Sequence, residues 1–246
     1  MKPAYGLDAP GVVRNLALGG LAALIAAIAV QFLPFHPADR NIASAWFSVT
    51  AAVFFVEVAW MVYSSRVGKL RQRQILVDSL GLKGDERVLD VGCGRGLLLV
   101  EAAKRLPHRM AVGIDLWSAR DLSGNRPEVT LENARKEGVA ERVNVVTGDM
   151  RRLPFCDAYF NAVVASFAIH NIGDASGRQA AVREIDRVLN RGGRIALLDF
   201  APTGEYAQLA GSGLDRRRPL AVQLPNVSTG AYGAREQTLM NMAVGR

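Results

Sequence analysis

Two long apolar runs near the start of the chain constrain its fold more than any other feature. Residues 16–35 (LALGGLAALIAAIAVQFLPF) include no charged side chain, and residues 42–63 include one, Glu57. A helix of about 20 residues rises roughly 30 Å, which is the hydrocarbon thickness of a bilayer. We therefore predict two transmembrane helices, at about 16–35 and 42–63, within a membrane anchor that covers residues 1–65.

Charged residues around the two runs predict their orientation. Lys2 and Arg14 precede the first run, and the connector carries Asp39 beside Arg40, so it adds no net positive charge. The basic cluster that follows the second run consists of Arg66, Lys69, Arg71 and Arg73. We expect this cluster to face anionic lipid headgroups. By the positive-inside rule both ends then lie in the cytoplasm, which predicts a multi-pass protein of the cell membrane whose remaining domain is cytoplasmic. A cleaved signal peptide fits less well, because the second apolar run follows almost at once.

Composition narrows the partners. The net charge of +7 raises nucleic acid as a partner, but no basic stripe with interleaved aromatics and no zinc-ligand spacing accompanies it. We expect the lipid bilayer as a partner and no nucleic acid. The two cysteines, Cys93 and Cys156, predict neither a disulfide framework nor a metal site. Glu57 keeps two interpretations: an ionisable functional group inside the membrane, or a side chain that reaches the interface or pairs with a basic neighbour.

Beyond the anchor, short apolar strands alternate with helices. A basic juxtamembrane linker at 66–84 includes a short helix at 74–80. The expected strands are 87–91, 110–115, 143–147, 162–166 and 194–200, and the expected helices between them are 96–106, 130–137 and 178–189. Such alternation indicates βαβ units. It predicts an α/β domain over 85–224, a Rossmann-like, mostly parallel sheet with helices on both faces, followed by a poorly defined tail at 225–246.

A glycine-rich turn joins the first strand of this domain to its first helix. The sequence Gly92-Cys93-Gly94-Arg95-Gly96 follows directly on Val91. Glycines at such a turn let the backbone approach a ligand closely. Dinucleotide-binding turns have the spacing G-x-G-x-x-G, whereas the third glycine here comes one residue early. Asp90 also precedes the first glycine by two residues, and a carboxylate there suits a cationic sulfonium better than an anionic pyrophosphate.

Two further acids follow the next strands. Asp115 ends the second strand, nineteen residues after Gly96, where a carboxylate can accept hydrogen bonds from ribose hydroxyls. NAD and S-adenosylmethionine both carry such a ribose, so Asp115 indicates a nucleoside without choosing between them. Asp149 follows the third strand, where it could meet an adenine amino group.

Five segments in this order resemble the successive motifs of class I S-adenosylmethionine-dependent methyltransferases. They are VLDVGCGRG (88–96), GIDLW (113–117), GDMRRLPF (148–155), AVVASFAIHNI (162–172) and VLNRGGRIALLDF (188–200). The resemblance covers roughly residues 75–200. It implies the family's seven-stranded, mostly parallel sheet and S-adenosylmethionine as the cofactor.

The resemblance also implies a site. The first motif would shape the pocket for the methionine moiety, Asp115 would hold the ribose, and residues 166–170 would line the place where the methyl group meets its acceptor. The cofactor-binding residues that it implies are Asp90, Gly92, Cys93, Gly94, Gly96, Asp115, Leu116, Asp149, Met150 and Ser166. His170 is the candidate general base, needed only if the acceptor arrives protonated, and Asp199 is a further candidate.

The chain departs from the family pattern in two places. After Phe200 the segments 205–210 and 220–224 suggest a short helix and one strand, so the family's last strand is missing or altered. Residues 117–129 are longer than the usual link after the second strand, and fit either a lid or a plain surface loop.

These observations predict a membrane-anchored S-adenosylmethionine-dependent methyltransferase that acts on a small, lipophilic acceptor. Two alternatives stay open. One is a membrane-tethered cofactor-binding or scaffold protein without turnover, and the other is a nicotinamide-dependent oxidoreductase.

Overall fold

The structure is a computed structural model that describes residues 3–7, 9–119, 122, 124–199 and 220–223. The described residues form two compact units. Residues Gly6–Arg71 make up one, and the residues before Gly6 together with those from Gln72 onward make up the other.

The first unit is a helical hairpin. Helix α1 (Pro10–Ala29) passes through a 3-10 turn, η1 (Val30–Phe32), to α2 (Pro37–Tyr63), which continues into a π-helical turn, η2 (Ser64–Gly68). Both α-helices have a proline in their first turn, where the missing N–H costs nothing.

Small residues let the two helices pack closely. A Cβ added at Gly19 would lie 3.2 Å from the ring of Phe54, and a Cβ added at Gly20 would lie 3.2 Å from the ring of Phe55. The apolar side chains on the outside stay exposed, for example Ile25 on α1 and Val56 on α2. Helix α1 begins at Pro10 rather than at residue 16, because an apolar run marks what a bilayer could cover and does not mark where a helix starts.

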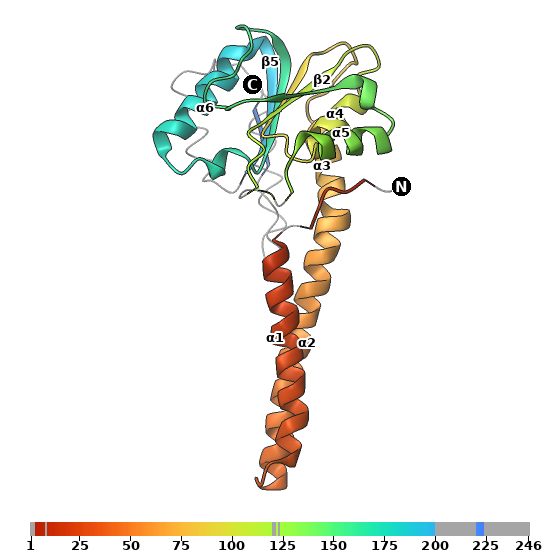
Figure 1. Cartoon of the computed structure of the whole chain (residues 1–246), viewed down its shortest axis with the longest axis vertical. Helices are drawn as coiled ribbons and strands as arrows, with labels where there is room; N and C mark the ends of the chain where they lie inside the picture. Colours follow the sequence, from red (N-terminus) through yellow and green to blue (C-terminus); the bar gives the residue numbers. More distant parts are fainter. Residues whose placement is uncertain (1–2, 8, 120–121, 123, 200–219, 224–246) are drawn as a thin grey trace, which may run out of the picture. The chain divides into compact units, whose positions relative to one another are not determined.

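The second unit holds a six-stranded sheet in which all neighbouring strands are parallel (Figure 1). The strands are β1 (Val88–Val91), β2 (Ala111–Asp115), β3 (Val143–Thr147), β4 (Phe160–Ser166), β5 (Leu189–Leu198) and β6 (Leu220–Gln223), in the order β3-β2-β1-β4-β5-β6. The helices of this unit are α3 (Lys69–Asp78, from Gln72 onward), α4 (Leu97–Lys104), α5 (Pro127–Lys136) and α6 (Ala175–Val188), with 3-10 turns η3 (Ala140–Arg142) and η4 (Ile169–Asn171).

Helices cover both faces of the sheet. Alternate residues of each strand point to opposite faces, so Ala162 and Val164 of β4 join one buried cluster while Val163 and Ala165 join the other. The first cluster contains residues of α3, α4 and α5, and the second contains residues of α6. The predicted fold class, an α/β Rossmann-like sheet with helices on both faces, is confirmed.

The largest difference from the expected strands concerns β5. It begins at Leu189, which pairs with Phe160, whereas the expected strand began at Arg194. The register shifts between Phe160 and Ala162, and Gly192 has a φ of 78°. A strand interrupted by an irregularity and glycines lacks the continuous apolar run that marks a strand in a sequence. The expected helix at 205–210 and the tail at 225–246 lie outside the described residues.

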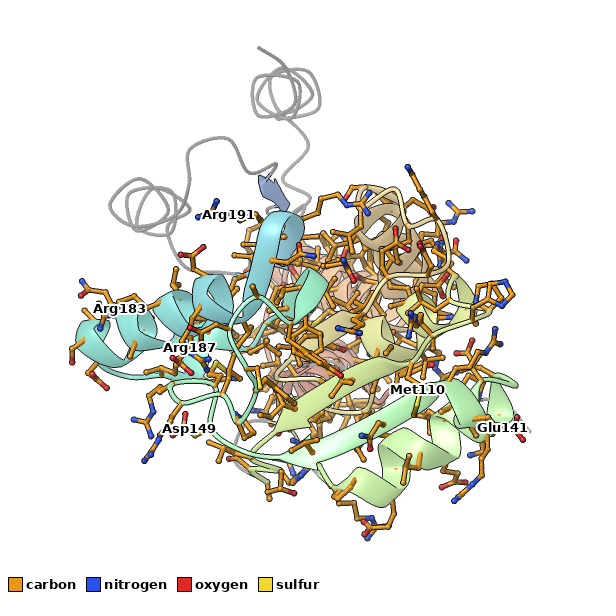
Figure 2. The ribbon with its side chains drawn as sticks, turned by 90° about the horizontal axis from the view of Figure 1, so that it is seen from above. Met110, Glu141, Asp149, Arg183, Arg187 and Arg191 are labelled. Carbon is orange, nitrogen blue, oxygen red and sulfur yellow. The ribbon has the colours of Figure 1, made fainter. Side chains whose placement is uncertain are left out.

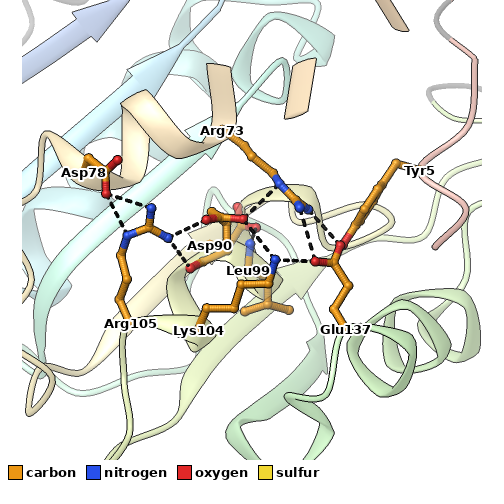
Figure 3. A network of polar contacts seen from close by, with 9 residues as sticks. Tyr5, Arg73, Asp78, Asp90, Leu99, Lys104, Arg105 and Glu137 are labelled. Atoms are coloured by element: carbon orange, nitrogen blue, oxygen red, sulfur yellow. Dashed lines mark hydrogen bonds and ion pairs between the residues drawn. The ribbon is translucent and has the colours of Figure 1, made fainter. Parts of the chain in front are cut away.

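Helices α3 and α4 are joined by a buried network of ion pairs (Figure 3). The Arg73 side chain, 6% exposed, places Nε 2.9 Å from Glu101 Oε2 and Nη1 3.0 Å from Glu137 Oε1. Glu137, just after α5, also pairs with Lys104 and accepts a 2.5 Å hydrogen bond from the Tyr5 hydroxyl. The expectation that Arg73 faces lipid headgroups is therefore wrong, because two buried carboxylates hold its guanidinium.

Candidate cofactor site

The predicted cofactor residues lie at or just after the carboxyl ends of adjacent strands. Asp90 is level with Gly113, Asp115 with Thr147, and Ser166 with Leu198. In Figure 2, Asp149 lies at the end of the sheet opposite Met110 and Glu141, which precede β2 and β3. Parallel strands thus bring segments from five strand ends to one edge, where open α/β sheets bind their ligands.

The glycine loop is tightly folded onto this edge. The Gly92 and Cys93 N–H groups donate to Ile114 O at 2.8 and 3.1 Å, so the loop turns across the end of β2. Gly92 has a φ of 71°, and a Cβ added there would lie 2.3 Å from the Ala168 Cβ. Gly96 has a φ of 80°, and its added Cβ would lie 2.7 Å from Thr130 Cγ2. Both positions require glycine for conformation and for space.

Asp115 connects this loop to the segment after β2. Its Oδ2 accepts from the Gly94 N–H at 2.8 Å, and its Oδ1 accepts from the Trp117 N–H at 2.7 Å and from Asn125 Nδ2 at 3.0 Å. Trp117 has a φ of 58°, which is strained for a bulky residue, and the hydrogen bond to Asp115 supports it.

Asp90 lies beneath the loop. Its side chain is 2% exposed and its Oδ2 accepts a 2.8 Å hydrogen bond from the Leu99 N–H in the first turn of α4. Burial raises the pKa of Asp90 to about 8, the Leu99 hydrogen bond opposes this rise, and the charge of Asp115 adds to it. Asp90 therefore anchors the start of α4 as a largely protonated carboxyl at neutral pH.

Two residues beside these acids differ in exposure. The Cys93 side chain is buried, and its Sγ lies 2.7 Å from the position of a Cβ added to Gly113. Burial raises the pKa of this thiol, and the charges of Asp90 and Asp115 add to the rise. Leu116, by contrast, is exposed. Cys93 thus fills a packed position, whereas Leu116 is open to solvent.

Asp149 and Met150 follow β3 on the same edge. Asp149 pairs with the exposed Arg151, whose Nη2 lies 2.6 Å from Asp149 Oδ2. Hydrogen bonds from Arg151 lower the pKa of Asp149, with burial opposing them. Met150 packs against the cluster under α6, and its Cε would lie 3.4 Å from a Cβ added at Gly92. Met150 is therefore next to the glycine loop.

A histidine–aspartate pair follows β4 and β5. His170 Nδ1 lies 2.7 Å from Asp199 Oδ1, and Asp199 Oδ2 accepts from the backbone N–H groups of Ile169 and His170 at 3.1 and 3.2 Å. Asp199 is buried, so its carboxylate fixes both the turn and the imidazole ring. With Nδ1–H directed at the carboxylate, the neutral ring carries its acceptor lone pair on Nε2. Phe167, between Ser166 and this turn, has a φ of 50°.

Sequence reasoning missed several residues that shape the loop from α5. Thr130 Oγ1 donates to Gly94 O at 2.5 Å, and Asn133 Nδ2 donates to Arg95 O at 3.0 Å. Asn133 also accepts from the Ala4 N–H at 2.7 Å. Thr130 and Asn133 lie on one side of α5, and polar residues at this spacing are the available signal. The missed partner of Asp115 is Asn125, which looks like an ordinary turn residue in the sequence.

Comparisons with known proteins find a matching family model and several curated relatives. Residues 88–193 match a family model described as a methyltransferase domain. The chain is 34% identical over 132 residues to the ubiquinone/menaquinone biosynthesis C-methyltransferase UbiE of Geobacter sp. (strain M21), covering 53% of this chain and 52% of that protein. It is 32% identical over 129 residues to the enzyme of the same name from Dinoroseobacter shibae, covering 52% and 48%. The chain thus spans about half the length of the curated relatives it matches.

Similar solved structures include the YcgJ protein from Bacillus subtilis, at 27% identity and a TM-score of 0.44, covering 52% of this chain and 50% of that one. Another is geranyl diphosphate methyltransferase in complex with SAM, at 20% identity and a TM-score of 0.49, covering 62% and 66%. The family match favours the predicted methyltransferase over the nicotinamide-dependent alternative.

Proposed function

We propose that the chain is a class I S-adenosylmethionine-dependent methyltransferase that transfers a methyl group to a small acceptor. The proposal is supported by the match of residues 88–193 to a methyltransferase domain and by the methyltransferase relatives. The observation that carries the proposal is the arrangement around Asp115. Its carboxylate holds the Gly94 N–H of the glycine loop and the Trp117 N–H of the next segment, so that both border the same sheet edge.

The described residues fit this cofactor. At Gly92 the backbone of the loop lies directly against Ala168, and Met150 lies beside it. We propose that the glycine loop above Asp90 borders the methionine moiety, that Asp115 takes the ribose, and that Asp149 with Met150 borders the adenine. The thioether of Met150 offers an adaptable apolar contact for a flat base.

The cofactor supplies an activated methyl group on its sulfonium, and the residues of the chain align the acceptor and exclude water. Aligning two reactants in this way accounts for much of the acceleration in such displacements. Where the acceptor carries a proton, His170 takes it at Nε2, while Asp199 holds the ring through Nδ1. Ser166 begins the segment that lines this side.

The helical hairpin is the proposed membrane anchor. The segments Pro10–Phe32 and Pro37–Asp78 are both long and apolar enough to cross a membrane, and only 22% and 6% of their most apolar windows are buried. A core helix of a soluble protein would be mostly buried, so the exposure favours contact with lipid. Lys2 precedes α1, Arg14 lies near the start of α1, and Arg66 and Arg71 follow α2, so both ends face the cytoplasm.

An anchored enzyme meets acceptors that partition into the bilayer. The curated relatives are named as C-methyltransferases of ubiquinone and menaquinone biosynthesis, and quinones of that kind are lipophilic. Both facts support a small lipophilic acceptor for this chain.

The experiment uses the full chain in membrane vesicles with S-adenosylmethionine labelled in its methyl group. We expect label in lipids extracted by organic solvent. Label only in the aqueous fraction would contradict the lipophilic acceptor, and no label in either fraction would contradict the methyltransferase. In parallel, Asp115→Ala should weaken S-adenosylhomocysteine binding by about 1–3 kcal/mol in calorimetry, because it removes a charged acceptor. The control is Asp85→Ala, an exposed acid before β1, which should bind like the wild type.

A further inference from the structure

Asn125 presents a buried polar atom at the edge of the candidate site. The residue is 9% exposed, and its Oδ1 has no hydrogen-bond partner among the residues that the structure describes. Its Nδ2 donates to Asp115 Oδ1 at 3.0 Å. A carboxylate only accepts hydrogen bonds, so the amide nitrogen has to face Asp115 and the amide oxygen points elsewhere. The orientation of the side chain is therefore fixed by its neighbour.

An unsatisfied buried acceptor needs an explanation. Leaving such a group without a donor costs about 1–3 kcal/mol, and most buried polar groups in native proteins are satisfied. The Asn125 N–H donates to Leu122 O at 3.0 Å, and this backbone hydrogen bond closes the turn. The side-chain oxygen of Asn125 is therefore not needed to hold the turn. A donor supplied by a ligand accounts for the orphaned oxygen.

The hydrogen bonds that Asp115 already accepts limit how many ligand hydroxyls it can hold. A carboxylate has about four acceptor sites. Three are taken, by the Gly94 N–H on Oδ2 and by the Trp117 N–H and Asn125 Nδ2 on Oδ1. Asp115 therefore has capacity for one hydroxyl of a ribose diol, and the second hydroxyl requires another acceptor close by.

We propose that Asn125 is a cofactor-binding residue that shares the ribose diol with Asp115: one hydroxyl donates to the Asp115 carboxylate and the other to Asn125 Oδ1. The inference rests on the proposed function, because it takes S-adenosylmethionine as the ligand. It also changes the role expected of Asp115, which holds the loop and one hydroxyl rather than the whole diol.

The test measures, by calorimetry, how the full chain binds S-adenosylhomocysteine and its 2′-deoxy and 3′-deoxy analogues. The wild type should bind each deoxy analogue roughly 10-fold more weakly than the parent compound, as expected for one lost hydrogen bond. Asn125→Ala should bind S-adenosylhomocysteine roughly 10-fold more weakly, and should no longer distinguish it from one of the two analogues. Glu128→Gln, an exposed amide-for-acid exchange three residues on, serves as the control and should behave like the wild type.

Two results would overturn the inference while leaving the proposed function intact. One is an Asn125→Ala chain with wild-type affinity for S-adenosylhomocysteine. The other is an Asn125→Ala chain that binds S-adenosylhomocysteine more weakly but still loses affinity by the same factor for both deoxy analogues. That result would indicate that Asn125 only shapes the loop. If Asn125→Ala does not fold, Asn125→Asp, which keeps the shape but sets two carboxylates together, takes its place and should also bind more weakly. A wild-type chain that binds no S-adenosylhomocysteine would contradict the proposed function itself and the inference with it.

Discussion

At the scale of single residues, the acids of the sheet edge act on the backbone as well as on any ligand. Asp115 holds Gly94 and Trp117, and Asp90 holds Leu99. The loop is thus shaped by its own chain, which leaves less reorganisation for the cofactor to drive when it binds. Substitutions at this edge should be judged on stability and on binding separately.

Gly92→Ala should destabilise the chain by more than its backbone conformation alone explains. A left-handed φ costs a residue with a Cβ about 1–2 kcal/mol, and the contact at 2.3 Å from Ala168 should add about 1–3 kcal/mol of overpacking. Urea unfolding measures the total. Gly138→Ala is the matched control, because Gly138 has a φ of 74° with no atom within 4 Å of its added Cβ. Equal losses for the two variants would refute the clash, and Ala168→Gly should restore part of the Gly92→Ala loss.

Asp90 should make stability fall with rising pH. The pKa of Asp90 is about 8 in the folded chain against the ordinary value of 3.8. Between these two pH values the folded chain therefore holds a proton that the unfolded chain has lost. The stabilisation is complete below about pH 4 and is lost as pH rises towards 8. Asp90→Asn cannot ionise, so its unfolding free energy relative to the wild type should rise across this window. Urea titrations from pH 5 to about pH 9 measure the difference. A difference independent of pH would show that Asp90 does not carry this proton.

His170→Ala should lower kcat by about 100-fold or more while binding S-adenosylhomocysteine like the wild type, because a base acts on the acceptor only. Asp199→Asn should lower kcat too, since an amide can stabilise the wrong tautomer of the ring. His108→Ala, at an exposed position, is the control and should change neither quantity. An unchanged kcat for His170→Ala would mean that the acceptor arrives without a proton to remove.

At the scale of elements, the sequence predicts well where pattern and packing coincide. The runs around Val88, Val112 and Val163 are short, apolar and bounded by turns, and each forms a strand of the sheet. The start of β5 is different, because Leu189 and Asn190 follow the amphipathic helix α6 without a break in pattern. Only pairing with Phe160, a contact between segments distant in the chain, makes Leu189 a strand residue.

The ion-pair network is the part of the element packing that the sequence did not predict. Arg73 looked like a member of a solvated basic cluster, and nothing in its neighbourhood shows that Glu101 and Glu137 converge on it. Burial raises the pKa of Glu137, but the hydrogen bonds from Arg73, Lys104 and Tyr5 outweigh it and hold that pKa at about 2. The Glu137 carboxylate is therefore charged and depends on its cationic partners.

Arg73→Met should lower the unfolding free energy by about 3 kcal/mol, because it leaves buried carboxylates short of a partner. Arg71→Met, at an exposed position two residues away, removes the same charge from the surface rather than from the buried network. Its unfolding free energy should stay within about 0.5 kcal/mol of the wild type. Urea unfolding at neutral pH compares the two. Similar losses would show that the network contributes little beyond general charge.

At the scale of the whole molecule, motif order predicted the site while single contacts within it stayed hidden. The acids and glycines could be predicted because each lies at or just after the end of a strand, and strand ends of a parallel sheet converge. The role of Asn125 could not be predicted, because a lone asparagine before Arg126 and Pro127 is an ordinary residue in a turn that leads into a helix. Its significance depends on the orphaned oxygen and on Asp115, which only the folded chain brings together.

The proposed topology can be tested with the two native cysteines. Cys156 is exposed on the α/β unit, whereas Cys93 is buried with a raised thiol pKa, so a maleimide should react at Cys156 only. Right-side-out vesicles expose whatever lies outside the cell. An impermeant maleimide should therefore leave the wild type unlabelled until the vesicles are opened. Ala38→Cys, at an exposed position in the first turn of α2, should be labelled in closed vesicles, with Cys156→Ser in the same chain to isolate that signal. Labelling of Cys156 in closed vesicles would place the catalytic unit outside the cell. Protection of both positions until opening would mean that the hairpin does not cross the bilayer.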